Sequence, residues 1–197
     1  MIAALCCSFQ LGAQSTEAII AAFEKSYQEE AEQKYSAALT TMKSVSSPVN
    51  YAINLRTGWL AYMNGSYTDA VRFYQNAISV EPASIEARLG VVYPLAALEQ
   101  WDDVLKEYKS ILKIDPNHSV VNYRLGLMLY NRKDYGQARK YLAVVLDHYP
   151  FDYDANMLAG WTEYQLGERA KARAYFEKAL MYNPGDQSAL DGLKQIN

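Results

Sequence analysis

The chain has 197 residues, of which 50% are hydrophobic and 21% charged, and this balance excludes an intrinsically disordered polypeptide. Its 19 basic and 22 acidic residues give a net charge of −3, which argues against a general nucleic-acid binder because phosphate contacts need a surplus of basic side chains. The chain contains 17 tyrosines but only 5 phenylalanines, so we expect a large aromatic surface that is partly exposed to water.

The first segment, residues 1–14, is apolar and uncharged and ends in small and polar residues. This composition is typical of a secretory signal cleaved near Ala13-Gln14, although the basic residues that usually begin such a signal are missing. An apolar arm or a buried N-terminal helix is the alternative. Both cysteines, Cys6 and Cys7, lie in this segment, so neither a disulfide framework nor a thiolate metal site is expected in the folded body. No later segment is apolar for the roughly 18 residues that a membrane span needs.

Prolines recur along the rest of the chain, each 34 residues after the last, at Pro48, Pro82, Pro116, Pro150 and Pro184. Proline cannot continue a helix and disfavours helical backbone in the residue before it, so each proline marks a helix end. Each interval also contains a glycine, then an aromatic, a small and a larger residue at steps of three and four, which is one face of a helix. Turn residues such as Asn64-Gly65 and Leu166-Gly167 divide the intervals into two helices.

This succession of glycine, aromatic residue, small residue and terminal proline resembles the tetratricopeptide repeat family. The resemblance implies an all-α fold, a right-handed α-solenoid of eleven helices, with a concave surface lined by the first helix of each unit. It assigns residues 15–197 to a single domain. The predicted units are 17–48 (degenerate), 50–82, 83–116, 117–150 and 151–184, followed by a capping helix over 186–196.

The unit over 83–116 has irregular spacing, because Gly90 comes two residues earlier than the interval from Gly58 requires. Its first helix is therefore predicted to begin two residues early and to be followed by a longer turn. Pro94 lies inside this helix and is predicted to kink or loosen it. The irregularity would either open a pocket in the middle of the groove or only absorb the two extra residues.

The resemblance implies a partner-binding groove lined by the residues three before, one after and four after each glycine. Each such triplet lies on one side of a helix. The triplets are Leu55, Trp59 and Tyr62; Ala87, Val91 and Pro94; Tyr123, Leu127 and Tyr130; and Met157, Trp161 and Tyr164, with Met63 and Asn131 next along the same face. The alternative is that these side chains pack against neighbouring helices as part of the core.

A row of arginines, Arg56, Arg88 and Arg124, stands two residues before three of the glycines. In chaperone-binding members of the family, basic residues on this surface clamp a partner's terminal carboxylate, but the lysines of that clamp are not at the matching places here. One interpretation is an arginine ladder that pairs with acidic groups of a ligand and stacks on the neighbouring tyrosines. The other is ion pairing with acidic residues of adjacent repeats.

No motif indicates catalysis. The two histidines, His118 and His148, fall in different repeats, and the sequence has no phosphate-binding loop, nucleophile elbow or zinc-protease motif. We therefore expect no enzymatic activity, no cofactor and no metal.

The favoured function is a protein-binding scaffold that takes a partner segment in its aromatic groove, in assembly or maintenance of a bacterial envelope. A structural subunit that self-associates or docks through its convex face is the alternative. A carbohydrate-binding module is less favoured, because the predicted groove has few carboxylates and amides. Cleavage of the first segment would place the protein in the periplasm or at the envelope, whereas its retention would leave a cytoplasmic adaptor.

Overall fold

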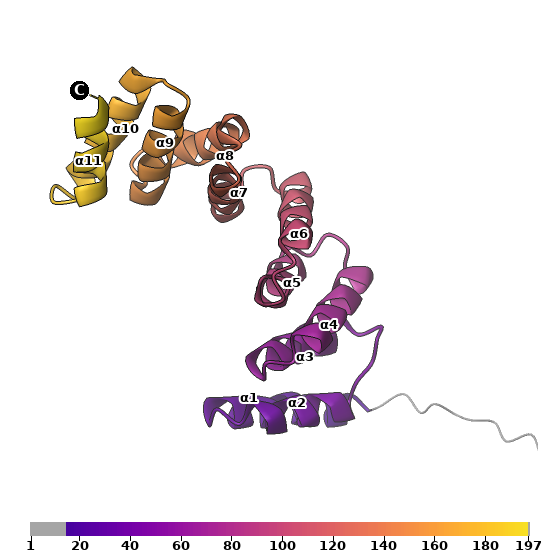
Figure 1. The fold of residues 1–197 in the computed structure, drawn as a ribbon. Coiled ribbons are helices and arrows are strands. Elements are labelled where there is room, and N and C mark those ends of the chain that lie inside the picture. The colour runs from indigo at the N-terminus through magenta and orange to yellow at the C-terminus, as the bar shows by residue number, and fades with distance from the viewer. Residues whose placement is uncertain (1–14, 197) are drawn as a thin grey trace, which may run out of the picture. The chain divides into compact units, whose positions relative to one another are not determined.

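The computed structural model describes residues 15–196, so the predictions for residues 1–14 concern a segment outside the described range. Within residues 15–196 the regular structure consists of eleven α-helices without a strand, and the predicted all-α fold class is confirmed (Figure 1). The helices are α1 (Thr16–Ala31), α2 (Tyr35–Ser44), α3 (Tyr51–Met63), α4 (Tyr67–Val80), α5 (Ile85–Ala97), α6 (Trp101–Ile114), α7 (Ser119–Asn131), α8 (Tyr135–His148), α9 (Tyr153–Gln165), α10 (Arg169–Tyr182) and α11 (Gln187–Ile196). None of them is long and apolar enough to cross a lipid bilayer.

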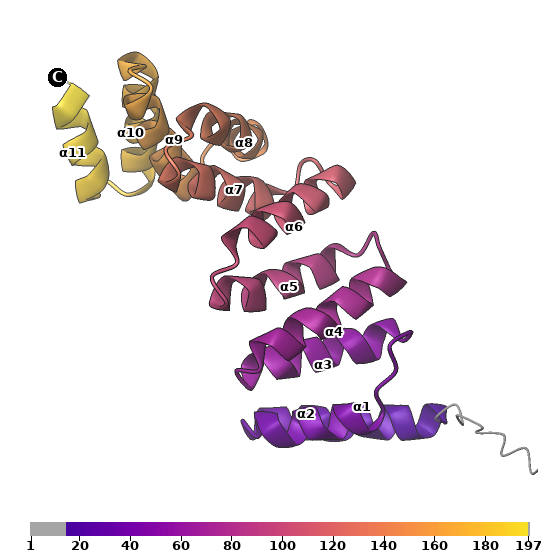
Figure 2. The same ribbon diagram turned by 45° about the vertical axis from the view of Figure 1, so that its right-hand side comes forward.

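The helices divide between two compact units, one ending at Trp101 and the other beginning at Asp102. In the N-terminal unit α1 packs on α2, α2 on α3, and α5 on both α3 and α4. In the C-terminal unit α8 packs between α7 and α9, and α10 packs between α9 and α11 (Figure 2).

The helix starts keep the interval of the prolines throughout the four clear units. The first helices begin at Tyr51, Ile85, Ser119 and Tyr153, and α11 begins one interval later at Gln187. The predicted early start of the helix in the 83–116 unit is therefore wrong, and the turn after α5 is as short as the others.

The predicted register of α5 is wrong because Gly90 and Gly58 are not equivalent positions of the repeat. The residue one interval after Gly58 is Val92, and Gly90 corresponds to Arg56. The helical assignment of α5 also continues through Pro94, whose carbonyl accepts a hydrogen bond from the amide of Leu98 at 3.0 Å.

The turns inside the helix pairs share one backbone conformation. Each contains a residue in the left-handed region, with φ between 58° and 77°: Gln33, Gly65, Glu99, Lys133 and Gly167. The amide of the following residue then donates to a carbonyl near the end of the preceding helix, as Ser66 does to Ala61 at 2.8 Å. Two of the five are the glycines that this conformation favours, and the other three adopt it at some cost.

The loops between helix pairs are held by a second repeated device. Buried Asn122 and Asn156 donate their side-chain amides to loop carbonyls, Asn122 to Pro116 at 3.0 Å and Asn156 to Pro150 at 3.1 Å. Asn54 makes the same kind of bond to Ser47 at 2.6 Å. These bonds pair carbonyls that would otherwise lack partners at the helix ends.

Candidate functional site: an aromatic groove in the N-terminal unit

An open groove of about 680 Å³ lies between α1, α3 and α5 of the N-terminal unit. Its lining is mostly apolar and aromatic, which is typical of binding sites. Phe23 and Tyr27 come from α1, and Tyr74 reaches the groove from α4. The remaining lining residues are Tyr51, Ala52, Leu55, Arg56 and Trp59 of α3, and Ile85, Glu86, Leu89, Gly90 and Tyr93 of α5.

Three of the lining rings are well exposed to solvent: Tyr27 at 55%, Tyr93 at 44% and Trp59 at 36%. The ring centroid of Tyr62 lies 5.9 Å from that of Trp59 and 5.7 Å from that of Tyr93. Tyr62 therefore connects the aromatic side chains of α3 and α5 into one row, at separations that favour aromatic pairs.

The floor of the groove contains an ion pair between Arg56 and Glu30. Arg56 is only 8% exposed, its guanidinium pairs with the Glu30 carboxylate, and its Nε donates to the Ser26 hydroxyl at 3.1 Å. The other oxygen of Glu30 accepts from Nε1 of Trp59 at 2.6 Å. Glu30 thus fixes both the arginine and the tryptophan ring, while the guanidinium carbon lies 3.9 Å from the centre of the Tyr27 ring.

The structure places the arginine row in three different environments. Arg56 pairs with Glu30 inside the chain, as the second interpretation of the row supposes. Arg124 donates to the Tyr108 hydroxyl at 3.2 Å. Arg88 lies one interval after Asn54 and one before Asn122, and like these asparagines it donates to a loop carbonyl, that of Pro82, at 3.0 Å. Its position in the repeat therefore differs from that of Arg56.

The prediction that Ala87, Val91 and Pro94 of α5 line the groove is wrong, because the register of this helix differs from the predicted one. Val91 is buried with Ala87 and Pro94 in the interior of the unit. Leu89 and Tyr93 line the groove instead, one interval after Leu55 and Trp59. The sequence contained this signal, because counting from the prolines rather than from Gly90 selects Leu89 and Tyr93.

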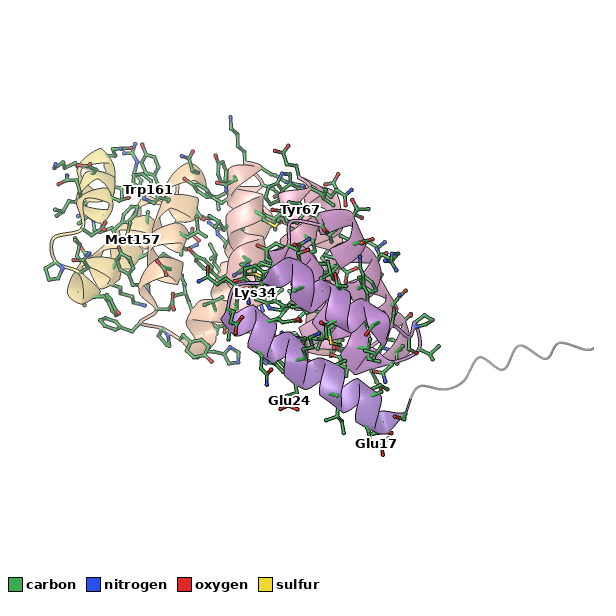
Figure 3. The ribbon with its side chains drawn as sticks, turned by 90° about the horizontal axis from the view of Figure 1, so that it is seen from below. Glu17, Glu24, Lys34, Tyr67, Met157 and Trp161 are labelled. Carbon is green, nitrogen blue, oxygen red and sulfur yellow. The ribbon has the colours of Figure 1, made fainter. Side chains whose placement is uncertain are left out.

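The C-terminal unit holds the remaining predicted groove residues. Among them, Trp161 is partly buried and packs against the buried cluster of this unit. Its ring centroid lies 5.0 Å from that of buried Phe176, and its Nε1 donates to the Ser188 hydroxyl of α11 at 3.0 Å. Met157 and Tyr164 of α9 pack against the same cluster. Figure 3 labels Met157 and Trp161 on this helix. Tyr123 and Tyr130 are half-buried beside buried Leu142, Leu158 and Ala159, whereas Leu127 and Asn131 are exposed.

Two predicted positions remain in the N-terminal unit. Tyr62 supports the aromatic row from the side, as described above, and Met63 at the end of α3 lines a polar hollow with residues of α1 and α2. Sequence reasoning missed Phe23, Tyr27 and Glu86 as groove residues, because α1 belongs to the degenerate unit and the α5 register was misassigned.

The electrostatics of the groove suit binding. Burial raises the pKa of the Tyr74 hydroxyl well above its usual value, and burial also raises the pKa of Tyr51, with the Glu86 carboxylate adding to the effect. The raised pKa values keep both hydroxyls protonated at neutral pH, and the Tyr51 hydroxyl donates to Glu86 at 3.0 Å. Among the described residues, no group of histidine, cysteine and acidic side chains could hold a metal ion. The groove therefore offers a ligand mainly aromatic and apolar surface.

Short helix pairs that recur at a fixed interval define a tandem-repeat protein. The family model described as "Tetratricopeptide repeat" matches residues 29–84, 94–153 and 123–189. The chain therefore belongs to the tetratricopeptide repeat family.

Curated relatives match only in part. The chain is 27% identical over 89 residues to TPR repeat-containing thioredoxin TTL4 of Arabidopsis thaliana, covering 45% of this chain and 13% of that protein. It is 26% identical over 113 residues to BBSome complex member BBS4 of Bos taurus, covering 56% of this chain and 21% of that protein. The chain thus spans about a fifth or less of the length of these relatives.

Solved structures agree over most of the chain. A tetratricopeptide repeat protein from Parabacteroides merdae ATCC 43184 has a TM-score of 0.77 at 19% identity, over 91% of this chain and 72% of that one. MamA has a TM-score of 0.74 at 18% identity, over 85% and 92%. YrrB, a TPR protein with an unusual peptide-binding site, has a TM-score of 0.72 at 19% identity, over 91% and 94%. These likenesses establish the fold.

Proposed function

We propose that this protein is a non-enzymatic scaffold whose N-terminal groove binds an extended or helical segment of a protein partner. The repeat fold itself supports a protein–protein interaction scaffold. The proposal that the groove itself binds the partner is supported by the exposure of Tyr27, Trp59 and Tyr93 around an apolar groove. The peptide-binding site of the structural neighbour YrrB is in keeping with it.

The groove is organised before a partner arrives, which lowers the cost of binding. Glu30 holds the Trp59 ring through its Nε1 and is itself held by Arg56. A ring that is already fixed loses little conformational entropy when a partner covers it. Tryptophan and tyrosine are also the side chains that most often dominate the free energy of a protein interface.

The proposal is tested by alanine substitutions of two exposed rings that line the groove, with a control substitution outside the groove. Trp59→Ala and Tyr93→Ala should each weaken a captured partner about tenfold or more, because large rings at the centre of an interface contribute most of its binding free energy. Met181→Ala, at an exposed position of α10, should leave binding unchanged. Affinity capture from the source cells identifies the partner, and titration calorimetry with that partner gives the affinities.

Thermal melting followed by circular dichroism separates binding from folding. The Tyr93→Ala variant should melt close to the wild type, since its ring is well exposed. If the Trp59→Ala and Tyr93→Ala variants both unfold, the two rings belong to the core and the groove is not a binding site. Folded variants that retain full affinity would also contradict the proposal.

We also propose that the protein is exported to a bacterial envelope and that residues 1–14 are removed on the way. Their apolar, uncharged composition supports this, and so does the helix start directly behind them, where the Ser15 hydroxyl accepts a hydrogen bond from the amide of Ala18 at 3.2 Å. Intact-mass measurement of protein from periplasmic and cytosolic fractions tests it. A cytosolic product that retains Met1 and both cysteines would overturn the proposal.

A further inference from the structure

The C-terminal unit exposes aromatic side chains that its own fold does not require. Phe151, in the loop between α8 and α9, is 53% exposed, and Tyr182, at the end of α10, is 61% exposed. The ring centroid of Tyr182 lies 5.9 Å from that of Phe151 and 5.5 Å from that of Tyr153. We call these three residues the aromatic ledge. One interval earlier the positions of Phe151 and Tyr182 hold Asn117 and His148, so the repeat forms without these two rings, whereas Tyr153 also packs against the buried cluster of this unit.

A hollow of about 340 Å³ shares the first turn of α9 with the ledge. Tyr123, Tyr149, Asp152 and Asp154 line it, together with Ser119, Val120 and Val145. Tyr149 and Val120 are exposed, so the hollow is open to solvent. Tyr153 of the ledge lies between Asp152 and Asp154 in sequence, so the ledge and the hollow meet at the first turn of α9.

This surface is negative. Residues 147–154 contain Phe151 of the ledge and three residues that line the hollow, and this stretch holds three aspartates and no lysine or arginine. The hollow has no basic residue in its lining. Within residues 15–196, neither Asp152 nor Asp154 forms an ion pair. Burial, and then the charges of the Asp154 and Asp152 carboxylates, raise the pKa of the Tyr123 hydroxyl in this hollow.

We infer that the ledge and the hollow bind a protein segment in which a lysine or arginine is flanked by apolar side chains. The cation enters the hollow between the rings of Tyr123 and Tyr149 and the carboxylates of Asp152 and Asp154, where ring faces and charges both attract it. The apolar flank covers Phe151 and Tyr182. An anionic membrane would be repelled by the same aspartates, so the charge selects a protein as the partner.

Three labelled, amidated peptides provide the probes. They share one length and one set of apolar residues, and their charged positions are filled with lysine, glutamine or glutamate. Fluorescence anisotropy with the full chain should show the lysine peptide binding about tenfold tighter than the glutamine peptide, as expected for desolvated charge complementarity, and no binding of the glutamate peptide. Equal binding of all three peptides would overturn the inference.

Matched variants locate the binding. Asp154→Lys should weaken binding of the lysine peptide about fivefold or more. Asp103→Lys makes an equal change of net charge at an exposed position of α6 and should have a much smaller effect. Phe151→Ser should weaken binding of the lysine peptide about tenfold, because it removes an apolar ring from the surface. Val49→Ser, at another exposed apolar position, should leave this binding unchanged.

Two further measurements separate this surface from other sites. Trp59→Ala, in the N-terminal groove, should leave binding of the lysine peptide unchanged, so this surface can fail or succeed independently of the proposed groove. Equal effects of Asp154→Lys and Asp103→Lys would show unspecific attraction and overturn the inference. Binding of the wild type to phosphatidylglycerol vesicles, abolished by Phe151→Ser, would also overturn it in favour of a lipid surface.

Discussion

At the scale of single residues, the most consequential contacts are those between glycines and buried rings. The Tyr74 ring lies between Gly58 and Gly90, and the Phe176 ring lies between Gly160 and Gly192. A Cβ added at Gly90 would lie 2.3 Å from a Tyr74 ring carbon, and one added at Gly192 would lie 2.5 Å from a Phe176 ring carbon. Each ring therefore packs against the backbone of two helices, and glycine is required because no side chain fits between them.

The first prediction compares two glycines of the C-terminal unit. Gly160→Ala should destabilise the protein by about 1–3 kcal/mol, because the new Cβ would lie 2.6 Å from the ring of fully buried Phe176. Gly136→Ala, in α8 with no atom within 4 Å of the added Cβ, should stabilise it by up to roughly 0.5–1 kcal/mol. Urea unfolding followed by circular dichroism measures both. Equal effects would show that the Phe176 ring yields without cost.

Single residues also mark the limit of prediction from the sequence. The identity of Arg56 was evident, but its partner Glu30 was not, because α1 lacks the glycine that aligns the other first helices. Which side chains meet across α1 and α3 depends on the rotation of α1 about its axis, and the degenerate unit contains no marker for it. For the same reason Phe23 and Tyr27 could not be assigned to the groove in advance.

At the scale of elements, α11 shows how the end of the repeat array is held. Asp186 precedes the helix, and its Oδ1 accepts from the amide of Ala189 at 2.7 Å. Its Oδ2 accepts from the hydroxyl of Tyr153 at 2.5 Å. These hydrogen bonds, the one from Tyr153 above all, hold the pKa of the Asp186 carboxyl below its usual value. One carboxylate therefore caps α11 and joins it to the first residue of α9.

The second prediction is a pH dependence of α11. Because the pKa of Asp186 is lowered in the folded state, its stabilising effect is complete above the ordinary carboxyl pKa of about 4 and is lost as the pH falls through the lower, folded value. The protection factors of residues 187–196, that is their hydrogen-exchange rates relative to the intrinsic rates at the same pH, should therefore fall below about pH 4. Asp186→Asn should exchange faster at pH 7 and show a weaker pH dependence. An unchanged acid response in the variant would assign it to other carboxylates.

Elements were the features that the sequence predicted best. The prolines located the helix ends, and the eleven predicted helices match the eleven in the described residues. The disturbed spacing of the first unit arises from a short α2 and a longer connection to α3. Both glycines lie against the Tyr74 ring, but at different atoms: Gly58 of α3 is nearest to Cδ2 and Gly90 of α5 is nearest to Cε1. The two glycines are therefore not equivalent positions of the repeat, and aligning them gives the wrong register for α5.

At the scale of the whole molecule, packing is local along the chain. Within each of the two units, helices contact only the next helix or the next but one. In repeat proteins of this kind the free energy of unfolding is approximately a sum of unit and nearest-neighbour contributions. A local destabilisation therefore need not unfold the entire chain at once.

The third prediction uses one tryptophan in each unit as a reporter. Trp59 alone is kept in a Trp101→Phe, Trp161→Phe background, and Trp161 alone in a Trp59→Phe, Trp101→Phe background. Addition of Gly160→Ala should lower the urea midpoint reported by Trp161 more than the midpoint reported by Trp59, because the overlap with Phe176 lies in the C-terminal unit. Equal shifts of the two midpoints would show that the units unfold as one.

The equal spacing of the helix starts has a consequence for how such a chain changes length over generations. A gene that loses the codons for residues 119–152 joins the loop after α6 directly to α9, and α9 then stands where α7 stood, one interval after α5. Unequal crossing-over between repeats thus produces an in-register protein in a single event. Loss of one codon within a helix instead rotates everything behind it by about 100° and turns core positions towards water.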